Sequence, residues 1–381
     1  MQDNISDPIS TIAKQEGGQK KASRDLSGRL GNMPVEGVQG FGIIKHHPPP
    51  FDPVAQFDEA FDFYEEHGYV VVSQLSDGEV MALNAVCDAF NAERGAEIDV
   101  PGQGQLLFPL LNYPEFDGTV FHPKTLPLVA RILGGIENTR HIEFNYRGWQ
   151  PVTSDYGMEF HPDDCSGGLL TLDQRQTRRP YGPPDMLSTF TYLTDVDRTT
   201  PAFAVVPKSR RTHNIQRLRD VLGDEYGEVP IWGPAGTCCI VDRSTIHTRM
   251  DPLEKDTSKQ RSRRILHHVF ARAGELRNAD GSLRTGNGEP LALTDWAFSR
   301  GLIPKRLALS EDPEVARMFS VWSTRQEEWM AAGFSDDFVS DPKSARGPTL
   351  GPYRNDGKQT LTKKKAAARR KRAKRKTASR K

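Results

Sequence analysis

The sequence predicts a mainly β fold with flanking helices, in which short strands form a sandwich or a barrel. Short apolar runs between Arg140 and Phe270 are separated by Pro and Gly residues. These runs do not alternate with regular helical patterns, as parallel strands joined by helices would. Helical periodicity occurs instead before this segment and after Ala271. These observations favour a sandwich or barrel over a parallel α/β sheet.

Length and composition set the first limits on the protein. Its 381 residues, 36% of them hydrophobic, are enough for one large core or two modest ones. The four cysteines show no C-x-x-C spacing, which favours a reducing compartment over a disulfide framework or a zinc site. No run approaches the length of a membrane span, and the polar N-terminus lacks a signal-peptide apolar region. We therefore expect a cytoplasmic protein.

The net charge of +1 hides a strong asymmetry. Residues 363–381 contain twelve Lys or Arg and no acidic residue, which leaves 39 basic and 50 acidic side chains in the rest of the chain. Such a tail attracts polyanions and nucleic acids without regard to sequence. It predicts a polyanion contact, and a nuclear location if the source is eukaryotic, but it does not name a function.

Composition divides the chain into four parts. Residues 1–52 are polar and lack an apolar period, so we expect a disordered arm. Residues 53–272 carry the core-forming patterns. Residues 273–335 predict a helical appendage, whose main helix is expected over Asp312–Ala332. Residues 336–381 lack a core-forming pattern and include the basic tail, so we expect disorder there too.

The folded part opens with a helix and a strand. Between Pro53 and His67 the apolar residues recur at helical spacing. Gly68 is expected to end that helix, and the apolar residues 69–72 predict the strand. Ser76 with Glu79 three residues later forms a capping-box pattern, which predicts a second helix.

Three further segments lead to the centre of the fold. The Gly- and Pro-rich residues 95–125 are typical of a loop that folds over a site, and Leu126–Leu133 predict a short helix. The segment His141–Arg147 alternates polar and apolar residues, which predicts a strand with one buried face. Met186–Leu193 predict another strand.

A histidine and a carboxylate stand two residues apart at His161 and Asp163. On an extended segment the two side chains project from the same face, because strand side chains alternate with period two. One imidazole nitrogen and one carboxylate oxygen then bind the same metal ion. The triplet His141-Ile142-Glu143 has the same spacing, so this pattern by itself does not choose between them.

The third ligand is expected on a distant strand. The residues before His247 form a short apolar strand and a polar turn. Two histidines and one carboxylate leave coordination positions open, as in non-haem Fe(II) oxygenases. Farther on, Arg261–Phe270 starts basic and becomes a strand, where an arginine fork can hold the far carboxylate of a dicarboxylate.

The chain from Phe57 to Phe270 resembles the phytanoyl-CoA dioxygenase family of Fe(II)- and 2-oxoglutarate-dependent oxygenases. Residues 63–76 are similar to the opening of that family, and residues 200–209 to its middle signature. Lys208 and Arg210 stand where the family usually has Gly and His. We expect this departure to affect only a turn.

The resemblance implies a double-stranded β-helix, the jelly roll of cupin-like proteins. By position, His161, Asp163 and His247 match the iron ligands and are the expected catalytic residues. Arg263 matches the arginine that binds 2-oxoglutarate. The implied cofactors are Fe(II), 2-oxoglutarate as cosubstrate, and O2.

Two assignments in this site stay open at the level of sequence. Strand alternation places Arg263 and Arg264 on opposite faces, and Arg261 lies close by. Counting back from Phe270 selects Arg263, whereas the apolar residues do not decide. In an oxygenase barrel Asn145 and Arg147 would face the pocket and contact cosubstrate or substrate; the alternative is an ordinary strand with one solvated face.

The resemblance implies hydroxylation or desaturation of an unidentified small molecule, with decarboxylation of 2-oxoglutarate to succinate and CO2. Related halogenases replace the carboxylate ligand by a small residue, so Asp163 argues against halogenation. One alternative is a catalytically inert jelly-roll binding protein with a polyanion-binding tail. Another makes the tail the functional part of a nucleic-acid or anionic-surface binder.

Overall fold

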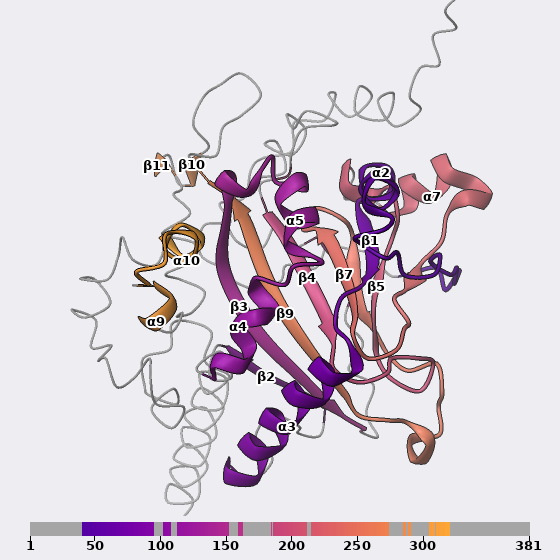
Figure 1. Ribbon diagram of the computed structural model, residues 1–381. Coiled ribbons are helices and arrows are strands. Elements are labelled where there is room, and N and C mark those ends of the chain that lie inside the picture. The colour runs from indigo at the N-terminus through magenta and orange to yellow at the C-terminus, as the bar shows by residue number, and fades with distance from the viewer. Residues whose placement is uncertain are drawn as a thin grey trace, which may run out of the picture.

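Figure 1 shows the computed structural model of the chain. The structure describes residues 40–94, 102–107, 113–151, 159–162, 184, 186–211, 215–273, 285–286, 289–290, 305–308 and 310–320. The expected disorder before residue 40 and the basic tail lie outside these residues, as does most of the expected helix 312–332. Among the described residues, no helix has the length and apolar character needed to cross a membrane.

Two antiparallel sheets form the body of the protein, and the predicted fold class is confirmed. The larger sheet has the strand order β1-β7-β4-β9-β3-β2, and the smaller has the order β6-β5-β8. Their strands are β1 (Tyr69–Ser73), β2 (Gly102–Leu107), β3 (Thr139–Gln150), β4 (Met186–Tyr192), β5 (Ala202–Val205), β6 (Val229–Pro230), β7 (Thr237–Asp242), β8 (His247–Met250) and β9 (Arg263–Arg272). A separate pair consists of β10 (Thr285–Gly286) and β11 (Glu289–Pro290).

Helices cover the outer face of the larger sheet (Figure 1). The α-helices are α2 (Phe57–His67), α3 (Asp77–Arg94), α4 (Asp117–Val120), α5 (Leu126–Ile132), α7 (Ile215–Leu222), α9 (Lys305–Ala308) and α10 (Pro313–Met318). Short 3-10 turns are η3 (Pro114–Phe116), η4 (Ile136–Asn138), η6 (Ser209–Arg211), η7 (Gly223–Glu225) and η8 (Thr257–Lys259).

The larger sheet is buried on both faces. Its inner face packs against the smaller sheet, where Phe190 of β4 stacks on Phe203 of β5 with ring centroids 4.1 Å apart. Its outer face packs against the helices through residues such as Leu266. The adjacent Cys238 and Cys239 belong to the outer and inner clusters respectively, as expected for neighbours on a strand.

The predicted ends of α2 and α3 agree with the structure. Gly68 follows α2 with φ +81°, a left-handed conformation that closes the helix. A Cβ at this position would lie 2.6 Å from Thr245 Oγ1, so the close approach also requires glycine. At α3, the Ser76 amide donates to Glu79 Oε2 at 2.7 Å, and the Glu79 amide donates to Ser76 Oγ at 3.4 Å.

Two segments contribute more structure than we expected. Residues 102–107, placed in a loop by their Gly and Pro content, form β2 and pair with β3 along the edge of the larger sheet. Residues 40–52, expected in the N-terminal arm, already pair with the domain. Phe51 bridges to Val72, and Ile44 bridges to Glu228. Backbone pairing, which does not depend on the side-chain pattern, explains β2. In residues 40–52 it is joined by side-chain packing, since Phe41, Ile43 and Phe51 lie against the apolar clusters.

The turn after β5 contains Lys208, at a position where the resembled family usually has glycine. Lys208 has φ +64° and is, among the described residues, the one non-glycine with positive φ. Its amide donates to the His67 carbonyl at 3.0 Å, and its ammonium group lies 3.2 Å from Glu66. The unusual conformation is therefore held by the contact between this turn and the end of α2.

The strain at Lys208 leads to a stability prediction. Lys208→Gly should be more stable than Lys208→Ala by about 1 kcal/mol, because only glycine adopts positive φ without a Cβ penalty. Both variants lose the same partly exposed ion pairs, so that loss cancels in the comparison. Urea unfolding of the two variants measures the difference. Equal stabilities would show that the turn relaxes without cost.

Candidate functional site

The structure brings His161 and His247 together. The two residues form an antiparallel bridge, in which the amide of each donates to the carbonyl of the other at 2.9 Å. Their ring centroids are 4.8 Å apart, and both side chains are buried. Segments that are distant in sequence thus present two imidazoles at one point between the sheets.

Hydrogen bonds to the main chain set the tautomer of both rings. His161 Nδ1 lies 2.8 Å from the Glu159 carbonyl, and His247 Nδ1 lies 2.8 Å from the Thr245 carbonyl. A carbonyl only accepts, so Nδ1 carries a hydrogen in each ring, and in the neutral tautomer Nε2 is the nitrogen with the lone pair. Metal-binding histidines show this arrangement, because the second bond fixes the tautomer and the ring orientation.

The third expected ligand, Asp163, lies outside the described residues. Within the described part, no group of three His, Cys, Asp or Glu side chains could hold a metal ion. The His161 and His247 pair nevertheless fits one, since both rings have the ligand tautomer and come from facing backbone positions. Pro162 follows His161, and Asp163 comes next, two residues from the histidine in sequence.

The inner face of the larger sheet is organised in rows, which follow from the strand registers. We number them from the end at which β4 begins. The first row contains Glu143, Val269 and Ser188; the second contains Asn145, His267 and Phe190; the third contains Arg147, Ile265 and Tyr192; the fourth contains Trp149 and Arg263. Successive rows are two residues apart, or roughly 6.6 Å along a strand.

The two histidines belong to the first-row end of this interior. Strand β7 ends where Asp242 pairs with Leu187, beside the first row, and a short turn leads directly to His247 at the start of β8. In that turn, Arg243 donates to Ser188 Oγ at 3.2 Å. Strand β8 then runs toward the other end. The candidate metal site and the fourth row therefore mark opposite ends of one interior.

Aromatic rings connect the two sheets between these ends. The Phe203 ring lies 5.2 Å from the His247 ring and stacks on Phe190. On its other side Phe190 stacks on His267, with centroids 4.4 Å apart and an interplanar angle of 6°. The stack excludes water from the interior beside His247, which strengthens electrostatic interactions there.

Arg263 points into this interior. Its side chain is 2% exposed, and its Nη1 donates to the Pro201 carbonyl at 2.6 Å. Its Nε has no hydrogen-bond partner, and no carboxylate of the described residues pairs with it. Burial, with the nearby charges of Arg249 and Arg147, lowers the pKa of Arg263 to about 9, so it stays protonated at neutral pH. A buried cation of this kind fits an anionic ligand.

The two neighbouring arginines have other partners. Arg264 points to the helices, where it donates to Asn84 Oδ1 at 3.0 Å and to Asp88 Oδ1 at 2.6 Å. Arg261 is half-exposed and lies 2.6 Å from Asp197 Oδ2. Both guanidinium groups are therefore already neutralised by carboxylates of this chain. Of the three candidates, Arg263 is the one available to an internal anion.

The remaining predicted residues, Asn145 and Arg147, also lie on the inner face. Asn145 is fully buried, donates to Glu143 and lies 3.5 Å from His267 Nδ1. Arg147 Nη2 lies 3.4 Å from the same nitrogen. The polar face of β3 is thus turned to the interior and not to solvent. Sequence reasoning missed His267, because its role depends on the register of β9.

The second triplet, His141-Ile142-Glu143, is divided by a β-bulge. The register shifts between His141 and Glu143, so His141 faces the helices and Glu143 faces the interior. His141 Nε2 lies 3.1 Å from His268 Nδ1. Burial lowers the pKa of His268 to about 3 and also lowers that of His141, so both rings are neutral. The two triplet residues do not face a common ion.

An apolar cluster supports the two histidines from behind. Phe160 and Ile246, the residues directly before His161 and His247, both belong to it. Phe41 and Ile43 of the N-terminal segment pack against the same cluster. The backbone that carries both candidate ligands is therefore held in part by residues 40–45.

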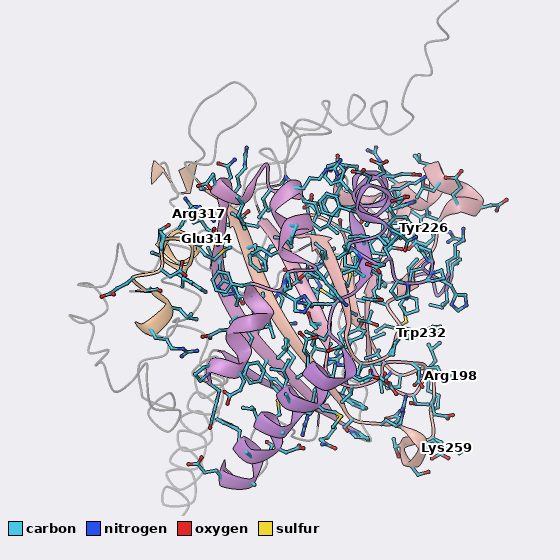
Figure 2. All side chains as sticks on the ribbon, viewed as in Figure 1. Arg198, Tyr226, Trp232, Lys259, Glu314 and Arg317 are labelled. Carbon is cyan, nitrogen blue, oxygen red and sulfur yellow. The ribbon has the colours of Figure 1, made fainter. Side chains whose placement is uncertain are left out.

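A buried carboxylate fixes this N-terminal segment. Glu228 is 2% exposed and accepts hydrogen bonds from the Phe41 amide, from the Gly42 amide at 3.1 Å and from the Tyr226 hydroxyl at 3.1 Å. Burial and the Glu228 charge raise the pKa of Tyr226, which stays a donor. Figure 2 labels Tyr226 and Trp232 on this side of the molecule, where His47 also bonds to the Trp232 carbonyl.

Comparison with known protein families gives one match. The profile described as phytanoyl-CoA dioxygenase (PhyH) matches residues 64–251, which include His161, Asp163 and His247. Residues 64–251, just under half of the chain, therefore match the phytanoyl-CoA dioxygenase family. Members of this family are enzymes of the Fe(II)- and 2-oxoglutarate-dependent oxygenase type, which use O2. Arg263 lies beyond the matched residues, so its assignment depends on the strand register alone.

Solved structures match the chain at low identity, whereas no curated protein sequence matches. The α-ketoglutarate-dependent carbocyclase SnoK from nogalamycin biosynthesis is 21% identical, with TM-score 0.45, over 64% of this chain and 96% of its own. The epimerase SnoN from the same biosynthesis is 18% identical, with TM-score 0.44, over 63% and 97%. HygX from Streptomyces hygroscopicus, crystallised with nickel and 2-oxoglutarate, is 14% identical, with TM-score 0.43, over 65% and 100%.

The Glu228 contacts predict a link between the N-terminal segment and metal affinity. Glu228→Gln places an amide donor against a backbone amide donor, which should cost about 1–3 kcal/mol of unfolding free energy. Loosening residues 40–45 should also weaken Ni(II) binding, because Phe160 and Ile246 lose their cover. Urea unfolding and calorimetric Ni(II) titration measure the two effects.

The exposed neighbour Glu225 supplies the control, since Glu225→Gln changes the same charge without these contacts. An unaltered Ni(II) affinity in Glu228→Gln, with the stability loss present, would contradict the link.

Proposed function

We propose that this protein is an Fe(II)- and 2-oxoglutarate-dependent dioxygenase that hydroxylates or desaturates a small molecule, with decarboxylation of 2-oxoglutarate to succinate and CO2. One observation carries the proposal: the paired rings of His161 and His247 and the unneutralised cation of Arg263 lie in the same interior. The family match supports the oxygenase class, and the finer reaction is inferred from the residues present.

The metal site of the proposed enzyme consists of His161, Asp163 and His247. The first and last residues present Nε2 as the unprotonated nitrogen, held by hydrogen bonds of Nδ1 to main-chain carbonyls. Asp163 supplies a carboxylate, which makes up the set of two histidines and one acid preferred by non-haem Fe(II). Ferrous iron held there supplies O2 activation coupled to oxidation of the cosubstrate.

The cosubstrate site is assigned to the third and fourth rows. Arg263 provides a protonated guanidinium with an unused Nε donor, which suits the far carboxylate of 2-oxoglutarate. Arg147 adds a second positive charge one row away, and Asn145 lies one row farther toward the histidines. In this assignment the three residues bind and orient the cosubstrate along the interior.

The reaction type follows from the identity of residue 163. A carboxylate there occupies the position that halogenases of related type leave to a halide, so hydroxylation or desaturation is the expected outcome. The buried stack of Phe203 and Phe190 keeps bulk water from the interior beside His247. Water exclusion protects a reactive site from side reactions. In this proposal the chain supplies metal ligands, a positive charge that binds the cosubstrate, and buried aromatic rings beside the metal site.

Removal of single metal ligands tests the proposed function. His161→Ala and His247→Ala should each abolish Fe(II) binding and 2-oxoglutarate decarboxylation, because each removes one imidazole ligand. Asp163→Ala should abolish product oxidation even where some metal binding remains. Anaerobic Fe(II) titration and succinate release measure these outcomes. Loss of iron in His141→Ala with retention in Asp163→Ala would show that the other triplet binds the metal.

A second prediction concerns the cosubstrate anchor. Arg263→Ala should raise the 2-oxoglutarate dissociation constant by about 30-fold to several thousand-fold, since loss of a buried charge pair costs about 2–5 kcal/mol. Arg261→Ala and Arg264→Ala are matched controls, whose guanidinium groups pair elsewhere. Calorimetry on Ni(II)-loaded protein gives the constants. A large rise in Arg264→Ala alone would mean that the assumed register is wrong by one residue.

A further inference from the structure

We propose that Glu143 and Ser188 form a substrate subsite that binds hydroxyl groups, so that the substrate is an uncharged small molecule with more than one hydroxyl group. This inference rests on the proposed function and names the substrate class for the same interior. It follows from two polar groups of the first row, each of which has hydrogen-bonding capacity that the described residues do not use.

Glu143 and Ser188 lie in the first row of the inner face. Glu143 pairs with Val269, and Ser188 pairs with Val269 from the other side. They are therefore two strand spacings apart, or roughly 9.6 Å between backbones, with a valine between them. Because the first row lies at the end where His247 begins β8, the pair lies at the same end of the interior as the candidate metal site and at the opposite end from Arg263.

Glu143 presents an acceptor that no described residue satisfies. Its side chain is 7% exposed, and one carboxylate oxygen accepts a hydrogen bond from Asn145 Nδ2. The other oxygen, Oε2, is buried and has no hydrogen-bond partner. Buried polar atoms without a partner are costly and uncommon in native proteins, so a donor from a ligand is the natural partner of this oxygen.

Ser188 presents the complementary donor. Two donors face His267 Nδ1, Asn145 Nδ2 at 3.5 Å and Arg147 Nη2 at 3.4 Å, so this nitrogen is the acceptor of the ring. His267 Nε2 then carries the hydrogen and donates to Ser188 Oγ at 3.1 Å. Arg243 Nη1 donates to the same oxygen at 3.2 Å. With two bonds received, the Ser188 hydroxyl hydrogen is left to donate.

An acceptor and a donor on one level select for the chemistry of a hydroxyl group, which both donates and accepts. An ammonium group would satisfy Glu143 but not Ser188, and it would meet the positive charges of Arg147 and Arg243 on either side of His267. A hydrocarbon chain would leave Glu143 Oε2 unpaired, and sites with unpaired buried polar groups reject such ligands strongly. The charges and the hydrogen-bond pattern therefore favour an uncharged polyol.

The test measures stimulation of 2-oxoglutarate decarboxylation by named probes in the Fe(II)-loaded protein. The probes are myo-inositol and glucose as polyols, L-carnitine as a cation and octanoyl-CoA as an acyl chain. At least one polyol should stimulate decarboxylation. Glu143→Ala should raise its half-saturating concentration about 10- to 100-fold, as loss of a hydrogen bond to a charged group implies. Ser188→Ala should act in the same direction, and the exposed control Glu115→Gln should not.

A second measurement separates a ligand site from a structural role and covers the case in which Glu143→Ala fails to fold. Glu143→Gln keeps an oxygen for Asn145 and replaces the unpartnered charged oxygen by a neutral amide. A binding role predicts an equal or higher melting temperature in the absence of probe, together with a weaker polyol response. A lower melting temperature with an unaltered polyol response would overturn the subsite.

The remaining outcomes are also decisive. Stimulation by L-carnitine or octanoyl-CoA alone would overturn the hydroxyl assignment, as would the absence of stimulation by both polyols. In those cases 2-oxoglutarate decarboxylation without any probe would still be present, so the proposed function would stand. If that decarboxylation is missing from the Fe(II)-loaded wild-type protein, the proposed function fails instead.

Discussion

The pairing of β9 with β3 on one side and β4 on the other is the constraint on which the rest of the site depends. These two ladders fix which side chains of β9 enter the space between the sheets and which face the helices. A shift by one residue would exchange Arg263 for Arg264 and His267 for His268. Both faces of β9 carry arginine, histidine and apolar residues, so the register of one strand decides which of these residues reach the interior and which face the helices.

The interior between the sheets contains buried polar and charged groups that lower the stability of the folded protein. Arg263 is a buried cation with no carboxylate of the described residues beside it, and Glu143 retains an oxygen that no described residue satisfies. Groups of this kind destabilise a protein unless a ligand or a metal satisfies them. Their concentration on one face of one sheet, while the opposite face packs mainly apolar side chains against helices, marks this face as the functional one.

Support for the two histidines comes from the backbone and from a distant segment. The reciprocal amide–carbonyl bonds between His161 and His247 place the rings without relying on side-chain packing. Behind them, an apolar cluster that includes Phe160 and Ile246 is covered by residues 40–45, which Glu228 anchors. Ligand orientation in such a site is set by this outer layer, which makes a segment far from the chemistry part of its geometry.

The sequence by itself determined what depends on local pattern. Period-two alternation predicted the strands, the Ser76–Glu79 pair predicted a helix start, and Gly68 predicted a helix end. The spacing of His161 and Asp163, together with the resemblance to a family, pointed to an iron oxygenase, because metal ligands leave a pattern of residue types in the chain. None of these features needs knowledge of which strand lies beside which.

Only the tertiary structure decided which face of each strand is inside. Both faces of the larger sheet are buried, so apolar residues occur on each, and alternation cannot distinguish them. The bulge between His141 and Glu143 breaks the alternation of side chains along β3. It places these two residues on opposite faces of the sheet, although their spacing in the sequence predicts the same face. The pairing of 102–107 rests on main-chain hydrogen bonds, which carry no side-chain signature. The docking of residues 40–52 combines such bonds with long-range contacts of Phe41, Ile43 and Glu228, which local pattern does not show.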